Sequence, residues 1–139
     1  MAFRDFLSSI GFGSMKVDTV VERPNLKEGE TLRGTVYFEG GDSDQEIEFV
    51  ELQVIKQVDE YRSDSDFSVI ETVVGKQTME FASAVKSKEK TMQPFDIVPD
   101  EHWIVENPKG KLLLRTIVHI DNGVDARDED EITYGKSEG

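Results

Sequence analysis

Hydrophobic and polar positions alternate with a period of two over most of the chain. Between 31 and 38, one parity carries Leu32, Gly34, Val36 and Phe38, and the other parity is mainly polar. Successive side chains of a β-strand point to opposite faces, so this pattern predicts a strand with one buried face. Similar runs predict strands over 16–22, 45–60, 67–74, 76–81, 91–98, 111–121 and 132–134.

Two of these strands depart from simple alternation. In 45–60, Ile47 and Phe49 share one parity, whereas Val50 and Leu52 share the other. A β-bulge near Phe49 and Val50 would absorb that shift, because a bulge inserts one unpaired residue into a strand. In 111–121 both parities are largely apolar, which predicts partial burial on both faces of the sheet.

Turn-forming residues separate the predicted strands. They lie at Pro24, at 27–30, at 40–43 and at 107–110. Residues 61–66 read as a polar loop, and 86–90 as a turn or a lysine-guarded edge strand. Seven or eight strands without alternating helices predict an all-β fold, specifically an antiparallel sandwich of two sheets.

One segment near the start has helical spacing instead. Four large apolar residues recur at i, i+3, i+4 and i+7, namely Phe3, Phe6, Leu7 and Ile10. They predict a short amphipathic helix that ends at Gly11 and Gly13. This helix could cover one end of the core, bind a partner groove or a membrane surface, or be disordered. The expected organisation is therefore helix and glycine turn over 1–14, sandwich over 15–134 and polar tail over 135–139.

Composition and charge narrow the class of protein. Val, Ile and Thr number 32, whereas Ala and Leu number 11, which favours strands over helices. The net charge of −13 repels phosphate backbones and anionic lipids, so we expect no nucleic-acid partner, and membrane binding is disfavoured. Cysteine is absent, and no apolar run has the length of a signal peptide or a membrane span. We expect a cytoplasmic protein.

Few residues offer catalytic chemistry. His102 and His119 are the only histidines, and neither belongs to a recognisable nucleophile or metal motif. The glycine-containing run 11–16 follows a predicted helix and precedes a strand, whereas a phosphate loop follows a strand and opens a helix. The sequence therefore predicts no enzyme and no cofactor.

The negative charge is concentrated in two stretches, 39–83 and 121–139. The second includes a predicted acidic loop over 121–131, whose candidate site residues are Asp121, Asp125, Asp128 and Asp130. Such oxygen ligands suit calcium, although the spacing differs from that of a calcium-binding hand. The loop could instead be solvated or bind a basic partner. All three interpretations stay open.

Three segments resemble one known family. Residues 116–130 are similar to the closing motif of the bacterial sporulation-control (SpoOM) family, and 3–19 are similar to its opening helix and first strand. Residues 29–36 resemble its second strand, a pattern shared loosely with arrestin N-domains. The resemblance implies an arrestin-like, immunoglobulin-like sandwich in a regulatory or scaffolding protein.

This chain departs from the family pattern at a few positions. It has His119 where the family usually has Asp and Ala126 where the family has Pro, and family members usually continue into a second arrestin-like half.

Our hypothesis is a non-enzymatic module that binds protein partners through its helix, its acidic surfaces and its edge strands, which could also support a homo-oligomer. The alternative is a calcium-binding protein that uses the acidic loop.

Overall fold

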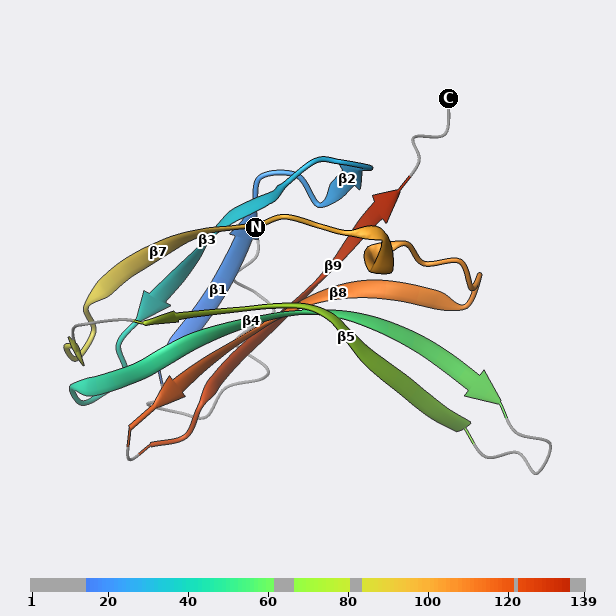
Figure 1. Ribbon diagram of the computed structural model, residues 1–139. Coiled ribbons are helices and arrows are strands. Elements are labelled where there is room, and N and C mark those ends of the chain that lie inside the picture. The colour runs from blue at the N-terminus through green and yellow to red at the C-terminus, as the bar shows by residue number, and fades with distance from the viewer. Residues whose placement is uncertain (1–14, 62–66, 81–83, 122, 136–139) are drawn as a thin grey trace.

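The structure of the protein is a computed structural model, which describes residues 15–61, 67–80, 84–121 and 123–135. Within these residues the chain is almost entirely β-structure (Figure 1). The elements are β1 (Lys16–Val21), β2 (Asn25–Lys27), β3 (Leu32–Glu39), β4 (Gln45–Tyr61), β5 (Phe67–Glu80), β6 (Ala84–Val85), β7 (Lys90–Ile97), the short 3-10 helix η1 (Glu101–Trp103), β8 (Gly110–Ile120) and β9 (Ala126–Gly135). The predicted helix over 3–10 lies outside the described residues.

Two sheets form a sandwich. The smaller sheet has the strand order β1-β3-β7, and the larger has the order β2-β9-β8-β4-β5, with β6 paired to the start of β4. Figure 1 shows the smaller sheet above one half of the larger one, while the far half of the β4–β5 hairpin extends beyond it. The prediction of a two-sheet all-β sandwich is confirmed. The larger sheet is not wholly antiparallel, however, because β2 pairs in parallel with β9.

The buried face predicted for the strand over 31–38 lies in the core between the two sheets. Leu32, Val36 and Phe38 are buried between the sheets, together with the inward residues of β4 and β8. Gly34 shares their face and leaves room for the Phe95 ring, because a Cβ at Gly34 would lie 2.8 Å from that ring and 2.5 Å from the carbonyl oxygen of Val20. The turn at 27–30 is also confirmed, with Gly29 at φ +93°.

The long strands match the pattern with small changes. The pairing of β4 with β8 shifts between Ile47 and Phe49, close to the predicted bulge. The two strands expected over 67–81 are one strand, β5, whose pairing shifts where Val54 and Ile55 face Gly75 and Val73. An irregularity at the glycine keeps the ladder continuous, because a bulge bends a strand without ending it.

The sequence did not predict the two short strands β2 and β6 or the 3-10 helix η1. β2 follows Pro24, whose carbonyl accepts a hydrogen bond from Thr133 N at 2.8 Å, and β6 has only two residues. The helix η1 buries Trp103, which packs over Gly75 of β5 and contacts the Tyr134 ring edge-on, with centroids 5.8 Å apart. Such short elements depend on tertiary contacts and leave no periodic pattern in the sequence.

Candidate functional site

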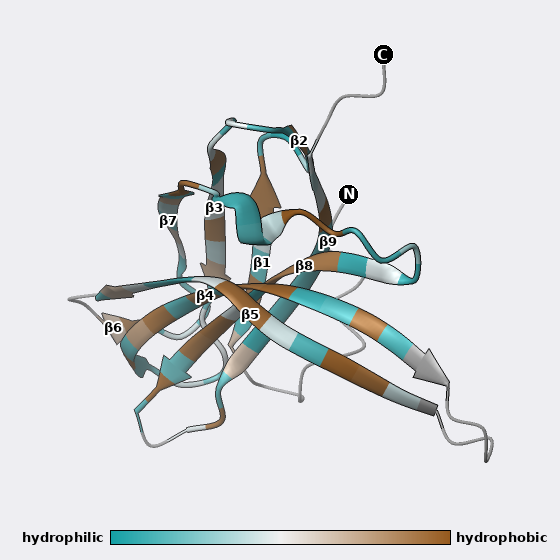
Figure 2. Ribbon diagram, turned by 45° about the vertical axis from the view of Figure 1, so that its right-hand side comes forward, coloured by the Kyte–Doolittle hydropathy of each residue, from teal (hydrophilic) through white to brown (hydrophobic). Residues whose placement is uncertain are grey.

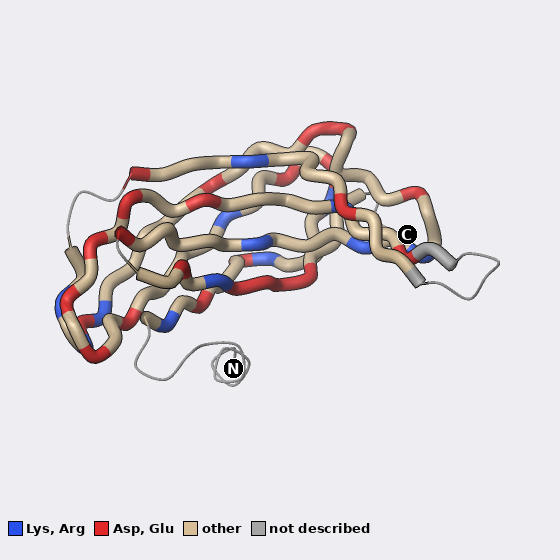
Figure 3. The backbone as a smooth tube through the Cα atoms, turned by 90° about the horizontal axis from the view of Figure 1, so that it is seen from below, with Lys and Arg blue, Asp and Glu red and all other residues tan. Residues whose placement is uncertain are grey.

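Charged side chains gather on the face of the larger sheet that points away from the core. Along β4 and β8 this face carries the parity opposite to the buried residues, so it receives Glu51 and Gln53 from β4 and Arg115 and His119 from β8. β5 adds Glu71 and Lys76. Figure 3 shows acidic and basic residues distributed along these strands. The sequence analysis missed most of this surface, because only the strand register brings its residues together.

Glu51 is the centre of what we call the Glu51 network, formed by Glu51, Gln53, Lys76, His119 and Asp125. Its Oε1 lies 3.0 Å from His119 Nε2, and its Oε2 accepts a hydrogen bond from Gln53 Nε2 at 2.9 Å. Lys76 Nζ lies 3.1 Å from the same Oε2. Both carboxylate oxygens therefore have partners, and the network connects β5, β4 and β8.

These contacts change the acidity of Glu51. Hydrogen bonds from His119, Gln53 and Lys76 stabilise the charged carboxylate, with His119 contributing most, and lower the pKa of Glu51 from 4.5 to about 2. Burial opposes this change because it disfavours the charged form, but its effect is smaller than that of the hydrogen bond from His119. Glu51 is consequently a weak base, poorly suited to accepting a proton near neutral pH.

His119 lies between two carboxylates. Its Nδ1 is 3.2 Å from Asp125 Oδ2 and its Nε2 faces Glu51, while the Phe49 ring stacks on the imidazole with centroids 4.2 Å apart. Asp125 also accepts a hydrogen bond from Ile120 N at 3.1 Å. His119 thus anchors the segment before β9 to the face of β4, and both of its nitrogens have acidic partners.

A second cluster lies beside the Glu51 network. The Arg115 guanidinium donates to Glu71 through both terminal nitrogens, at 3.2 and 2.9 Å, and to Glu129 through Nε at 2.6 Å. The Arg115 contacts lower the pKa of Glu71 and the Glu71 contacts raise the pKa of Arg115. Planar bidentate pairs of this kind are among the stronger hydrogen bonds in proteins. They join β5, β8 and β9 across the same face.

Apolar residues lie beneath these ion pairs. Ile55, Leu113 and Ile117 are buried on the outer face and are separate from the core between the sheets. Long charged side chains cover apolar surface with their methylene groups and keep the charged ends in water. The expectation that both faces of 111–121 are partly buried is confirmed.

The predicted acidic loop has a different structure. β9 begins at Ala126, so the prediction of a loop over 121–131 is wrong for 126–131. Asp128 lies on the β1 side of β9 and accepts a hydrogen bond from Thr19 N at 2.8 Å, and Asp130 has the same parity. Asp125 belongs to the Glu51 network, and Asp121 is exposed. Strand alternation sends neighbouring acids to opposite faces, and pairing with β8 stabilises a strand that local composition does not indicate.

This geometry does not support the calcium hypothesis. Within 15–61, 67–80, 84–121 and 123–135, no three His, Cys, Asp or Glu side chains form a group that could hold a metal ion. Asp128 and Asp130 lie on one face of β9, whereas Asp121 and Asp125 precede this strand and Asp125 is bound to His119, so the four do not surround one point as the six or more oxygen ligands of calcium must. We do not retain calcium binding as a function.

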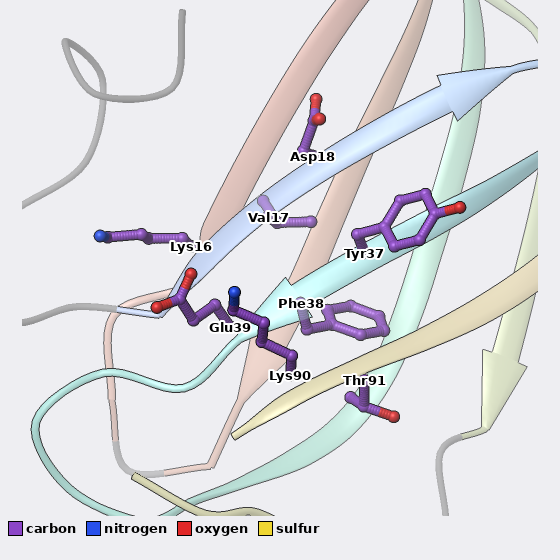
Figure 4. Close-up of a pocket in the computed structure, with 8 residues that line it drawn as sticks. All are labelled: Lys16, Val17, Asp18, Tyr37, Phe38, Glu39, Lys90 and Thr91. Carbon is purple, nitrogen blue, oxygen red and sulfur yellow. The ribbon is translucent and has the colours of Figure 1, made fainter. Parts of the chain in front are cut away.

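A small pocket lies on the smaller sheet. It has a volume of about 120 Å³ and is lined by residues of β1, β3 and β7 that include Val17, Tyr37 and Phe38. Figure 4 shows Lys16, Glu39 and Lys90 together at one end of it. The predicted binding residues Phe3, Phe6, Leu7 and Ile10 lie outside the described residues, so their relation to this pocket stays a prediction.

His102, the second histidine of the chain, has a local structural role. The Asp100 side chain accepts a hydrogen bond from His102 N at 2.8 Å and caps η1, and His102 Nδ1 lies 3.2 Å from the same oxygen.

In the described part of the chain, no helix has the length and apolar character needed to cross a membrane.

Comparison with known proteins identifies the family. The family model described as "SpoOM protein" matches residues 3–135, which is nearly the whole chain. The chain belongs to the SpoOM family. The resemblance found in the three sequence segments is thereby confirmed, and the SpoOM pattern extends through all the strands described above.

Two proteins give this membership more detail. The sporulation-control protein Spo0M of Bacillus subtilis is 28% identical over 138 residues, which cover 94% of this chain and 50% of the relative. The crystal structure of Spo0M from that organism matches with a TM-score of 0.77 and 24% identity, covering 91% of this chain and 51% of the other. The chain therefore spans about half the length of the curated relative, and the structural match supports the shared fold.

A more distant structure has a related architecture. A DUF4466 family protein from Parabacteroides merdae matches with a TM-score of 0.51 and 9% identity, over 88% of this chain and 46% of the other. At this identity the likeness concerns the fold alone. Fold likeness does not define function, because functional sites vary on a common scaffold.

Proposed function

We propose that this SpoOM domain is a non-enzymatic regulatory or scaffolding module that binds protein partners through the surface of an arrestin-like, immunoglobulin-like sandwich. The observation that carries the proposal is the long edge strand β5, which exposes Val69, Ile70 and Val73 beside a face of paired charges. Exposed apolar side chains on an edge strand are typical of surfaces to which another chain adds.

The polar clusters support binding over catalysis. Glu51 is engaged by three donors, and each ring nitrogen of His119 faces a carboxylate. A general base needs a pKa near the working pH, whereas the pKa of Glu51 is about 2. Paired charges of this kind set the orientation of a partner more than they drive a reaction.

The relative's name supports a regulatory role. Spo0M of B. subtilis is described as a sporulation-control protein, and this chain matches half of it. We extend the regulatory role to this chain as a proposal, together with the cytoplasmic location expected from the sequence. The contribution of the segment 1–14 and the possibility of a homo-oligomer stay predictions.

A capture experiment tests the proposal. The intact chain, a chain lacking 2–14 and an unrelated acidic protein of similar net charge are immobilised, and captured proteins are identified by mass spectrometry. We expect the intact chain to retain proteins that the acidic control does not. If the captured sets of the intact chain and the control are the same, the proposed function is wrong. A set lost only on deletion of 2–14 would assign the binding to the predicted helix.

A further inference from the structure

In the described part of the chain, one edge of the larger sheet has no paired strand. Among the described residues, β4 is the only strand that pairs with β5, and the hydrogen bonds outside the ladders do not involve the β5 backbone. β5 has fourteen residues, which is long for an edge strand. The second edge of such a strand presents a row of backbone donors and acceptors that only another extended chain matches.

The other described edges are short or guarded, whereas β5 is not. β2 has three residues and β1 has six, and β7 carries Pro94, which cannot donate to a ladder. β5 has no proline, and its only lysine, Lys76, is bound to Glu51 at 3.1 Å. Lysine, proline and bulges are the usual means of blocking strand addition, and the part of β5 before the pairing shift, 67–73, contains neither lysine nor proline.

The outer half of β5 adds an apolar surface to these backbone groups. Val69, Ile70 and Val73 are 45%, 45% and 51% exposed. Val69 and Val73 have the same parity and pair with Asp59 and Ile55 in the second half of β4. Figure 2 shows brown, hydrophobic stretches along β5. A strand that pairs here would place alternate apolar side chains beside them.

Charge indicates which extended chain fits. Residues 45–80, the stretch of sequence from the start of β4 to the end of β5, contain nine Asp or Glu and three Lys or Arg, within a protein of net charge −13. A second copy would bring an equally acidic hairpin to the edge, and like charges oppose such an association. A basic segment would be attracted by the same field.

We propose that the β5 edge binds an extended segment of a partner protein in which apolar residues alternate with Lys or Arg, and that this segment adds a strand to the larger sheet. The inference rests on the proposed function and gives its partner a chemistry. The apolar residues of the segment contact Val69 and Val73. Its basic residues lie on the opposite face of the added strand, where the overall negative charge of the β4–β5 segment attracts them.

Binding of a defined peptide tests the inference. The probe is a fluorescein-labelled peptide of about ten residues that alternates Val and Lys, and its binding to the full chain is followed by fluorescence anisotropy at about 150 mM salt. Two further peptides serve as controls. One has Glu in place of Lys, and the other has the same charge but carries prolines at two Val positions, which prevent strand pairing.

Two protein variants give the matched comparison. Val73→Lys places a positive charge on the β5 edge, whereas Met92→Lys makes the same change in net charge at a 60% exposed site on β7. We expect Val73→Lys to weaken binding about tenfold and Met92→Lys to weaken it less than about twofold. Circular dichroism checks that both variants are folded.

Four results would overturn the inference. Equal loss in both variants, or equal binding of the proline peptide, would mean that attraction is general and not located at the edge. Failure of the alternating peptide to bind the wild type would exclude this partner chemistry but leave the capture result standing. A wild-type dimer in light scattering that Val73→Lys dissociates would assign the edge to a second copy.

Discussion

The side-chain oxygens of Thr19 and Thr116 lie 2.7 Å apart between the two sheets. Both residues are buried, and they are 97 positions apart in the sequence. Thr19 belongs to β1 and Thr116 to β8, so this hydrogen bond connects the smaller sheet to the larger one. Buried hydroxyls need such partners, because an unsatisfied polar group in the core destabilises the fold.

This pair gives the first prediction. Thr116→Val keeps the side-chain shape but leaves the Thr19 hydroxyl without its partner, so we expect the free energy of unfolding to fall by about 1–3 kcal/mol. The double variant Thr19→Val/Thr116→Val should recover most of that loss, because neither hydroxyl is then buried unpaired. Urea denaturation measures both values. A double variant as unstable as the sum of the two single variants would contradict this interpretation.

The Glu51 network predicts a pH dependence. The pKa of Glu51 falls from 4.5 to about 2 on folding, so its contribution to stability is complete above pH 4.5 and is lost as the pH falls towards 2. Glu51→Gln should therefore lower the free energy of unfolding at pH 7 by about 1–3 kcal/mol, with a smaller difference from wild type at low pH. Denaturation series between about pH 2 and 7 measure this.

A carboxylate on the same strand provides the control. Glu46 is exposed on β4, and Glu46→Gln removes one negative charge without removing these contacts. We expect little change in stability for this variant. If both variants show the same pH dependence, the effect comes from net charge and not from the network.

Close packing at Gly34 gives a third prediction. A methyl group at Gly34 would meet the Val20 carbonyl oxygen at 2.5 Å, and a backbone atom cannot move away without disturbing β1. Gly34→Ala should destabilise the protein by about 1–3 kcal/mol, whereas Arg33→Ala, at the exposed neighbouring position of β3, should have a small effect. Thermal unfolding followed by circular dichroism compares them. Equal melting temperatures would show that the sheet adapts.

Trp103 gives a fourth prediction. It is the only tryptophan and is 1% exposed, so its fluorescence should shift to longer wavelength on unfolding. Trp103→Ala should lower the free energy of unfolding by about 3–5 kcal/mol, because it leaves a cavity over Gly75, and Trp103→Phe should lower it less. Denaturation followed by circular dichroism compares the three proteins. A stable Trp103→Ala variant would mean that η1 is dispensable.

How much the sequence predicts differs between the fold and the site. Alternation in 31–38 and 111–121 located the buried residues of β3 and β8 correctly, because side-chain direction in a strand follows local periodicity. The sequence does not predict the Glu51 network, although it offers His119 as one of two histidines and Asp125 as a candidate residue of the acidic loop. Charged residues at the outward-facing positions of β4 are visible in the sequence. Their partners can be identified only when the pairing register of β4 with β5 and β8 is known.

The acidic segment shows the limit most clearly. Its composition favours a solvated loop, yet β9 extends from Ala126 because β8 offers a paired edge, β2 adds on the other side and Asp128 contacts Thr19 N. Strand formation in such a segment depends on cross-strand contacts more than on intrinsic preference.

The sequence by itself determined the all-β class, most strand positions, the turns and the SpoOM family, since these depend on local periodicity and on motifs in order. Only the tertiary structure decided which of the described strands has an unpaired edge, which acidic and basic side chains pair and where His119 finds its partners. The physical reason is that registers and edges arise from contacts between residues far apart in the chain, such as Glu51 and His119.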